Sequence, residues 1–223
     1  MTPREAILDR IRLGLPYSVP VSQSPLPNHP VEEDPQVLIE EFASELDSLQ
    51  GKFLRVMRSE TVDTVSNLLD ERQAKHLLTW EGNQLPTPGL IETLKNRGYR
   101  CIPAEIPLNR YRRRNHLNNL SQAEVGITSA CGVISRIGAL VMAGGKGQGR
   151  LASLLPPVHI ALVTPDQFYP TLEVWLAAQN ALALFEDSSS LTLIAGPSRT
   201  SDIERVITLG AHGPRELIVI CLD

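Results

Sequence analysis

The sequence predicts an α/β protein built on an open, mostly parallel sheet with helices on both faces. From residue 34 onward, apolar strand-like runs alternate with stretches of helical periodicity, the order that parallel strands and right-handed crossovers require. Two of these runs, 191–195 and 217–221, are apolar almost without alternation, as expected for strands covered on both faces. Ligands of such sheets usually bind outside the carboxyl ends of the strands.

Length and composition support one soluble domain with an appendage. The chain has 223 residues, of which 42% are hydrophobic and 21% charged, close to the globular average. Its net charge of -4 argues against general binding to nucleic acids or anionic membranes. No apolar run approaches the length of a membrane span, and the N-terminus lacks a signal-peptide core. We therefore expect a cytoplasmic protein.

Residues 1–33 are expected to form an arm, separate from the α/β domain at 34–223. Residues 3–14 predict a helix, because Thr2 and Glu5 make a capping box and Pro3 stands at the first helical position. The proline-rich stretch 16–30 then favours an extended tether. Such a short helix cannot bury its apolar face alone, so it should dock on its own domain, on a partner, or on a second copy in a homo-oligomer.

The elements of the domain follow in order. Asp34 caps a helix that begins at Pro35 and points Leu38, Phe42 and Leu46 inward. Further helices are predicted over 60–73, 89–97, 108–122, 171–186 and 202–209. Strands are predicted over 52–57, 76–80, 99–102, 159–164, 191–195 and 216–222, with short strands near 125, 133 and 139.

No metal site or iron–sulfur cluster is expected on this chain. Cys101, Cys131 and Cys221 lie far apart, and the five histidines show no ligand spacing. A cluster or a structural zinc needs about four closely placed ligands. Scattered thiols also suit a reducing compartment.

The first candidate site follows the predicted strand at 191–195. Glycine and proline make a tight turn, Arg199 offers a planar fork for carboxylate or phosphate, and a predicted helix start offers free N–H groups. Ser201 and Glu204 form a capping box of their own, so anion binding and simple capping both remain open. The candidate residues are Gly196, Ser198, Arg199, Thr200, Ser201 and Asp202.

His212 lies in the segment 210–214, which is predicted to close the same helix. Its side chain could titrate near neutral pH. A right-handed crossover would place it about 12 Å from Arg199, one helix length away. A hydrogen-bonded histidine beside a helix cap is therefore favoured over a site residue.

A second candidate site is the glycine-dense stretch 126–149, which holds seven of the 15 glycines. It ends in Gly144-Gly145-Lys146-Gly147-Gln148-Gly149-Arg150, which is neither a Walker loop nor a dinucleotide fingerprint. Lys146 and Arg150 on flexible backbone could wrap an anionic substrate. A mobile hairpin tip is the other interpretation and is slightly favoured.

The basic run in the chain comprises Arg110, Arg112, Arg113 and Arg114. Tyr111 is its only aromatic residue, which disfavours a nucleic-acid groove. A solvated helix face or a docking patch for an acidic partner remain as interpretations.

The paired segments 196–204 and 210–214 resemble the signature of the LUD family, within which the lactate utilization protein C (LutC/YkgG-like) group is most similar. The stretches 126–128, 138–141 and 150–156 fall in the family's order. The resemblance implies a fold like the NagB/RpiA/CoA-transferase group. It also implies a component of L-lactate oxidation that acts beside iron–sulfur proteins and carries no cluster itself.

One departure from the family's pattern is expected to matter. Where many relatives have a small residue, Glu, Thr and Gly, this chain has Ser135-Arg136-Ile137-Gly138. The change lowers the expectation of acyl-transfer chemistry. It leaves two alternatives to the lactate role: a stand-alone enzyme or binding protein for a phosphate, carboxylate or CoA-type metabolite, and a non-catalytic assembly module.

Overall fold

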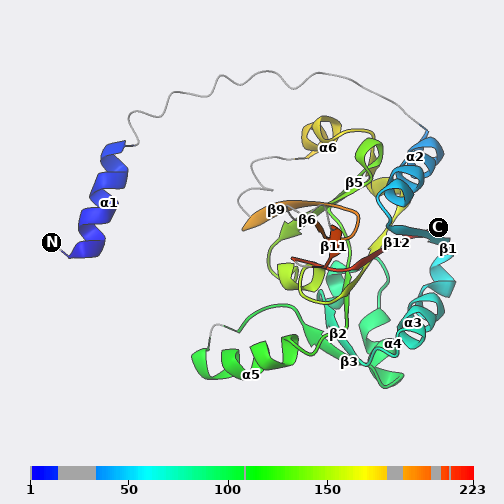
Figure 1. Cartoon of the computed structure of the whole chain (residues 1–223), viewed down its shortest axis with the longest axis horizontal. Helices are drawn as coiled ribbons and strands as arrows, with labels where there is room; N and C mark the ends of the chain where they lie inside the picture. Colours follow the sequence, from blue (N-terminus) through cyan, green and yellow to red (C-terminus); the bar gives the residue numbers. More distant parts are fainter. Residues whose placement is uncertain (1, 15–33, 108, 180–187, 202–206, 211) are drawn as a thin grey trace.

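A computed structural model describes residues 2–14, 34–107, 109–179, 188–201, 207–210 and 212–223. Its centre is a six-stranded sheet in the order β1-β12-β7-β4-β2-β3, in which every pair of neighbours is parallel. Figure 1 labels β1, β12, β2 and β3 of this sheet. The predicted open α/β sheet is thereby confirmed. The strands are β1 Lys52–Val56, β2 His76–Thr79, β3 Arg100–Pro103, β4 Val125–Thr128, β7 Val158–Val163 and β12 Glu216–Leu222.

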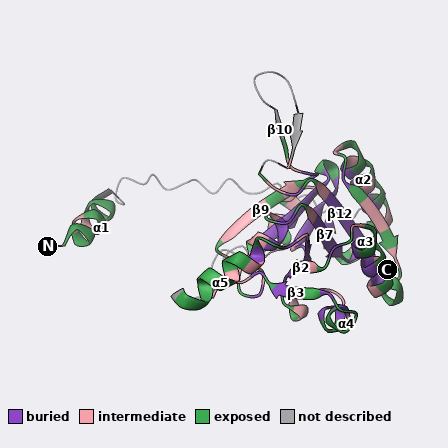
Figure 2. Ribbon diagram, turned by 60° about the horizontal axis from the view of Figure 1, so that its bottom comes forward, coloured by how far each residue is buried: buried purple, intermediate pink, exposed green. Residues whose placement is uncertain are grey.

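The connections place different elements on the two faces of this sheet. β1, β2 and β3 follow one another in one direction across the sheet, so right-handed crossovers put α3 (Thr61–Glu71) and α4 (Leu90–Asn96) on one face. The later connections run the opposite way and lie on the other face, including α5 (Arg110–Leu120). The central strands are consequently buried (Figure 2).

A second, four-stranded sheet occupies that other face. Its order is β8-β5-β6-β9, and β6 is antiparallel to both of its neighbours. Trp175 packs over Gly132, where an added Cβ would lie 2.3 Å from the indole nitrogen. The bounds are β5 Gly132–Ile134, β6 Ala139–Gly144, β8 Phe168–Tyr169 and β9 Ser190–Ala195.

Strand β9 differs from the sequence-based prediction. It was expected to be covered on both faces, but it lies at the edge of the small sheet and Leu193 is 45% exposed. β12 has the predicted environment, because it lies between β1 and β7 and is buried over nearly its whole length. An apolar run alone does not distinguish these two positions.

Helix α2 (Pro35–Ser48) joins the two sheets. The Asp34 carboxylate caps it by accepting a 2.9 Å hydrogen bond from the Gln36 N–H, as predicted. Phe42 makes edge-on contacts with Phe53 of β1 and Phe168 of β8, with ring centroids 5.7 and 5.5 Å apart. The helix therefore packs across the seam between the sheets.

Helix α1 (Pro3–Gly14) forms as predicted, with the capping box made reciprocally between Thr2 and Glu5. Ile7 and Ile11 on its apolar face are 58% and 57% exposed. The predicted tether at 16–30 lies outside the described residues. No helix in the described part of the chain is long and apolar enough to span a membrane.

Helix α6 is shorter than predicted. It runs from Leu172 to Ala178, and Thr171 caps it, whereas helical periodicity suggested a helix up to residue 186. The part of that prediction beyond Gln179, residues 180–186, lies outside the described residues. 

Candidate functional site

The two halves of the paired glycine-rich motif lie directly against each other. The Ser198 N–H donates to the Pro214 carbonyl at 2.8 Å, and the Gly210 N–H donates to the Ser198 carbonyl at 2.9 Å. An added Cβ on Gly213 would lie 3.3 Å from the Ser198 Cβ. The two segments, separate in the sequence, are therefore in direct contact in the fold.

Two short paired strands lie between these halves. Residues 207–209 form a strand, so the helix predicted over 202–209 is wrong at its end, while the first part of that prediction, 202–206, lies outside the described residues. β10 (Arg199–Ser201) pairs antiparallel with β11 (Ile207–Leu209), and Arg199 stands opposite Leu209. The β-branched residues Ile207 and Thr208 favour a strand. Thr200 and Ser201 lie in β10, while Asp202 is outside the described residues. The helix start that was to offer free N–H groups is not at Ser201.

His212 is correspondingly closer to Arg199 than the predicted crossover allowed. Gly210 and Pro214, on either side of it, both bond to Ser198. A hairpin returns the chain to its starting point, whereas a crossover helix would have carried it along the sheet. His212 itself is exposed.

The Arg199 guanidinium donates a hydrogen bond to the Leu49 carbonyl, at the C-terminal cap of α2. A cation at this position satisfies a terminal carbonyl and interacts favourably with the helix dipole. Gly196, with φ of 74°, packs on the same Leu49, where an added Cβ would lie 2.8 Å from the carbonyl oxygen. This turn therefore secures the end of α2.

The motif also lies at the amino edge of the parallel sheet. Pro214 leads into β12, and the neighbouring Arg215 N–H donates to the carbonyl of Pro157, just before β7. The motif follows β9, which belongs to the second sheet and pairs antiparallel with β6, so it does not end at the carboxyl edge of the parallel sheet. The usual ligand edge of an open parallel sheet is the opposite one.

The second candidate, the turn at 144–150, lies at the carboxyl edge. The Glu81 N–H, just after β2, donates to the Gly147 carbonyl at 3.0 Å, and the Gly147 N–H donates to the Glu105 carboxylate at 2.5 Å. An added Cβ on Gly149 would lie 2.4 Å from the Ala104 carbonyl. The stretch is thus a hairpin turn held against the ends of β2 and β3.

Lys146 and Arg150 on this turn are both exposed. In the described part of the chain, neither side chain makes an ion pair or donates a hydrogen bond. The carboxylates of Glu81 and Glu105 are nearby on the adjoining loops. Lys146 and Arg150 are therefore available to bind an anion at the carboxyl edge of the sheet, and the carboxylates of Glu81 and Glu105 lie beside the same turn.

Buried polar side chains lie behind this edge. Thr79, Thr128, Ser129 and Thr164 all stand at or just beyond strand ends and are at most 7% exposed. The Thr128 hydroxyl lies 2.8 Å from Nε2 of His159, which is fully buried, and the imidazole Nδ1 has no partner. Burial lowers the pKa of His159 to about 4. This histidine is neutral at pH 7 and acts as a hydrogen-bond partner rather than a charge.

The sequence analysis predicted His159 to lie in a strand but did not include it among the candidate site residues. A signal was present, because a histidine that interrupts the apolar run Val158–Val163 must be buried on one face of a covered strand. Gly126 of β4 pairs with His159 of β7, so the two residues face the same side of the sheet. An added Cβ there would lie 1.7 Å from the Ala152 carbonyl, so η5 (Arg150–Ser153) packs directly over this part of the sheet.

The departure at 135–138 contacts α2. Arg136 lies 3.9 Å from the Glu41 carboxylate, so this base has an acidic neighbour on α2. Gly138 has φ of 56°, and an added Cβ would lie 3.0 Å from the α2 backbone. The buried hydroxyl of Ser135 has no hydrogen-bond partner.

Within the described residues, no group of three or more His, Cys, Asp or Glu side chains is placed to hold a metal ion. The three cysteines are free thiols. Burial raises the pKa of Cys101 and of Cys221 to about 11, so neither is a reactive thiolate at neutral pH.

The parallel sheet, the side sheet packed on it and the contacting pair of glycine motifs define an α/β protein of the open-sheet class. A family model described as the LUD domain matches residues 39–222, and the chain belongs to the LUD domain family. This confirms the resemblance drawn from the motifs.

Relatives with curated names and one solved structure are consistent with membership of this family. The chain is 28% identical over 165 residues to lactate utilization protein C of Halalkalibacterium halodurans, covering 71% of this chain and 67% of that one. It is 36% identical over 112 residues to the protein of the same name from Macrococcus caseolyticus, covering 48% of each. The chain thus spans about half to two thirds of these relatives. A DUF162 family protein from Deinococcus radiodurans has a similar fold, with a TM-score of 0.63, 23% identity, and coverage of 86% of this chain and 99% of that one.

Proposed function

We propose that this protein is a component of an L-lactate utilization system and acts beside iron–sulfur proteins while binding no cluster itself. The observation that carries the proposal is membership of the LUD family together with relatives named lactate utilization protein C. Deleting its gene in the organism that encodes it should slow growth on L-lactate and leave growth on glucose unchanged. Unchanged growth on lactate would contradict the proposal.

The partners are proposed to carry the redox centres. The scattered thiols of Cys101, which is partly buried, and Cys221, which is buried, support this division of labour, because cluster ligands must be deprotonated and lie close together. A tagged full-length chain, purified from lactate-grown cells, should bring down iron–sulfur proteins identified by mass spectrometry. The same preparation from glucose-grown cells is the control.

The ligand is proposed to be a small carboxylate anion, and its site the carboxyl edge of the sheet. Lys146 and Arg150 are the exposed cations at that edge, and the buried threonines behind them offer hydroxyls. Arg199, by contrast, is engaged with the end of α2. We therefore propose a binding role for the turn at 144–150 and a structural role for the paired motif.

A thermal-shift series tests this assignment with lactate, pyruvate, phosphate, nucleotides and CoA as separate arms. A ligand specific to the folded state stabilises it by RT ln(1 + [L]/Kd), about 2.7 kcal/mol at a hundredfold excess over Kd. Lactate or pyruvate should raise the midpoint for the wild type and for Arg199→Lys, but not for a Lys146→Gln/Arg150→Gln variant. A shift that persists in that double variant would place the ligand elsewhere, and a shift with phosphate or CoA alone would favour the metabolite-binding alternative.

A further inference from the structure

Helix α5 concentrates positive charge where a helix disfavours it. Four of its first five residues are arginines, at 110 and 112–114, and its first turn holds no acid. Cations near a helix N-terminus oppose the helix dipole. The helix begins there because the Asn109 side chain accepts hydrogen bonds from the N–H groups of Tyr111 and Arg112, at 3.0 and 3.3 Å. Helix stability therefore does not account for the arginines.

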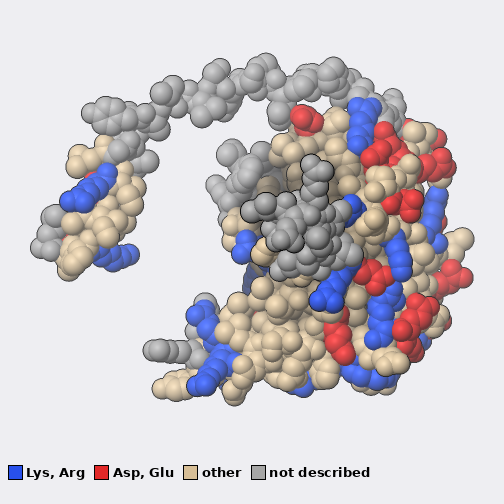
Figure 3. Space-filling view, in the orientation of Figure 1, with Lys and Arg blue, Asp and Glu red and all other residues tan. Residues whose placement is uncertain are grey.

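Arg112, Arg113 and Arg114 also lack, within the described residues, the acidic partners that other arginines have. Arg55, Arg72 and Arg97 each form an ion pair of 2.6 Å with a carboxylate. Within the described residues, no ion pair or side-chain hydrogen bond engages the exposed guanidinium groups of residues 112–114. Figure 3 shows Lys and Arg over α5 with no Asp or Glu visible beside them, whereas on the right of the same face Asp and Glu alternate with Lys and Arg.

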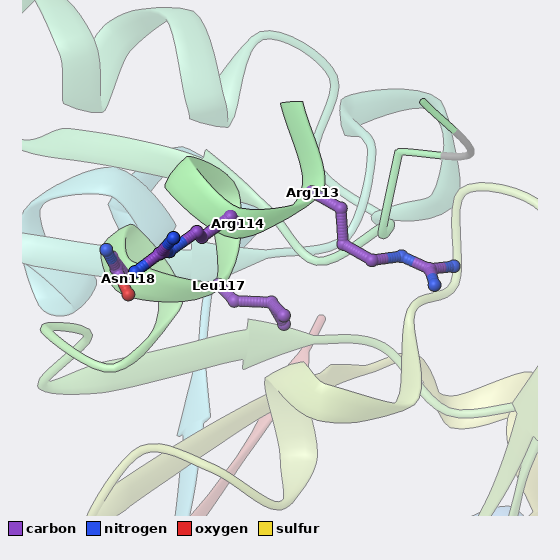
Figure 4. Close-up of a pocket in the computed structure, with 4 residues that line it drawn as sticks. All are labelled: Arg113, Arg114, Leu117 and Asn118. Carbon is purple, nitrogen blue, oxygen red and sulfur yellow. The ribbon is translucent and has the colours of Figure 1, made fainter. Parts of the chain in front are cut away.

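The same helix presents an apolar surface between its charges. A groove of about 380 Å³ is lined by Arg113, Arg114, Leu117 and Asn118. In Figure 4 the two arginine side chains leave the helix in opposite directions with Leu117 between them. Leu117 is 43% exposed, and Tyr111 at the start of the helix is 89% exposed. An apolar side chain with flanking carboxylates would complement this arrangement.

We propose that α5 is a docking surface for an acidic, partly apolar segment of a partner protein. The charge complementarity is direct, since bidentate Arg–carboxylate pairs combine geometry with charge. A membrane surface is disfavoured, because Tyr111 and Leu117 make too small an apolar face for an interfacial helix. Binding of nucleic acid is disfavoured by the single aromatic residue and by the net charge of -4. This inference does not depend on the proposed lactate role.

A second copy of this chain fits less well. Its acidic helix α2 lies on the far side of the domain from α5 (Figure 1). A contact between α5 of one copy and α2 of another would be heterologous and would not close into a two-fold dimer. The proposed occupant is therefore a different protein.

Fluorescence anisotropy with the full-length chain tests the proposal. The probe is a labelled synthetic peptide of glutamates with leucines at helical i, i+4 spacing. Arg113→Glu/Arg114→Glu should weaken its binding about tenfold or more, the scale of lost charge-assisted contacts. The matched control is Arg4→Glu/Arg10→Glu, which makes the same charge change on the exposed face of α1 and should change affinity by no more than about twofold, the scale of a screened surface charge.

A second pair of variants tests the apolar contact. Leu117→Ala should weaken binding of the peptide, whereas Leu155→Ala, at a leucine of similar exposure (45%), should not. Circular dichroism of each variant establishes that it is folded. Equal losses in the two charge variants would overturn the proposal, since they would indicate general attraction. Tighter binding of a single-stranded oligonucleotide or of phosphatidylserine vesicles, lost in Arg113→Glu/Arg114→Glu, would overturn it in favour of those ligands.

Discussion

Ser198 and Pro214 are joined by a backbone hydrogen bond of 2.8 Å, although the chain between them runs out and back through a hairpin. This hydrogen bond joins the two halves of the paired motif, 196–204 and 210–214, into one structural unit. That unit packs on Leu49, at the end of the helix that joins the two sheets.

Replacing Gly196 by alanine should destabilise the protein. Residue 196 has φ of 74°, and the new Cβ would lie 2.8 Å from the Leu49 carbonyl oxygen. Strain and overlap together should lower the free energy of unfolding by about 1–3 kcal/mol in urea titrations. Gly213→Ala is the control, because its nearest contact is 3.3 Å and its φ is not in the left-handed region. Equal losses in the two variants would show that the contact with α2 is unimportant.

Stability should fall in mild acid because of His159. Its pKa in the folded protein is about 4, below the ordinary 6.5, so the unfolded chain binds the proton more readily. The contribution is intact above pH 6.5 and is lost progressively as the pH falls toward 4, by roughly 3 kcal/mol in all.

The measurement is the free energy of unfolding from pH 7.5 to 4.5. His159→Gln should flatten this profile, while His212→Gln, at an exposed histidine, should leave it as in the wild type. A wild-type profile that is flat between pH 6.5 and 4.5 would contradict the assignment.

Substitution of Gly126 should be among the most damaging single-methyl additions. Its Cβ would lie 1.7 Å from the backbone carbonyl of Ala152, which no side-chain movement relieves. We expect Gly126→Ala to cost about 3 kcal/mol, measured by thermal and urea unfolding. Gly82→Ala, whose nearest neighbour is 3.9 Å away, should be close to neutral. A tolerated Gly126→Ala would mean that η5 does not pack on β4 as described.

Removal of residues 1–33 should leave the domain folded. In the described part of the chain, no hydrogen bond or ion pair joins α1 to residues 34–223. The truncated chain should unfold with the same free energy as the full chain. Sedimentation velocity of both forms then reports whether the apolar face of α1 joins two copies. Loss of folding on truncation would show that the arm belongs to the core.

Most of the fold could be predicted because its signals are local. Asp34 and Pro35 mark the start of α2, and the continuous apolar run of β12 reflects its position between two strands. The order of strands and helices then left little choice of architecture. Family membership was likewise carried by two short motifs.

The position of the site was harder to predict, because it depends on pairing between distant residues. β9 and β12 have similar apolar runs, yet one lies at an antiparallel edge and the other at the centre. The capping pattern of Ser201 and Glu204 suggested a helix, whereas pairing of Arg199 with Leu209 makes a hairpin. Because of these two differences, the paired motif lies at the amino edge of the parallel sheet and not at the carboxyl edge, where the sequence-based prediction placed it.

The placement of β12 has a consequence for biosynthesis. β1 has a single strand neighbour, and the Lys52 ammonium ion meets the Glu216 carboxylate at 2.8 Å across 164 residues of sequence. A nascent chain emerging from the ribosome exposes the whole unpaired edge of β1 until β12 has been made. Completion of the sheet therefore waits for late translation, and a prematurely terminated product would present an open strand to chaperones and proteases.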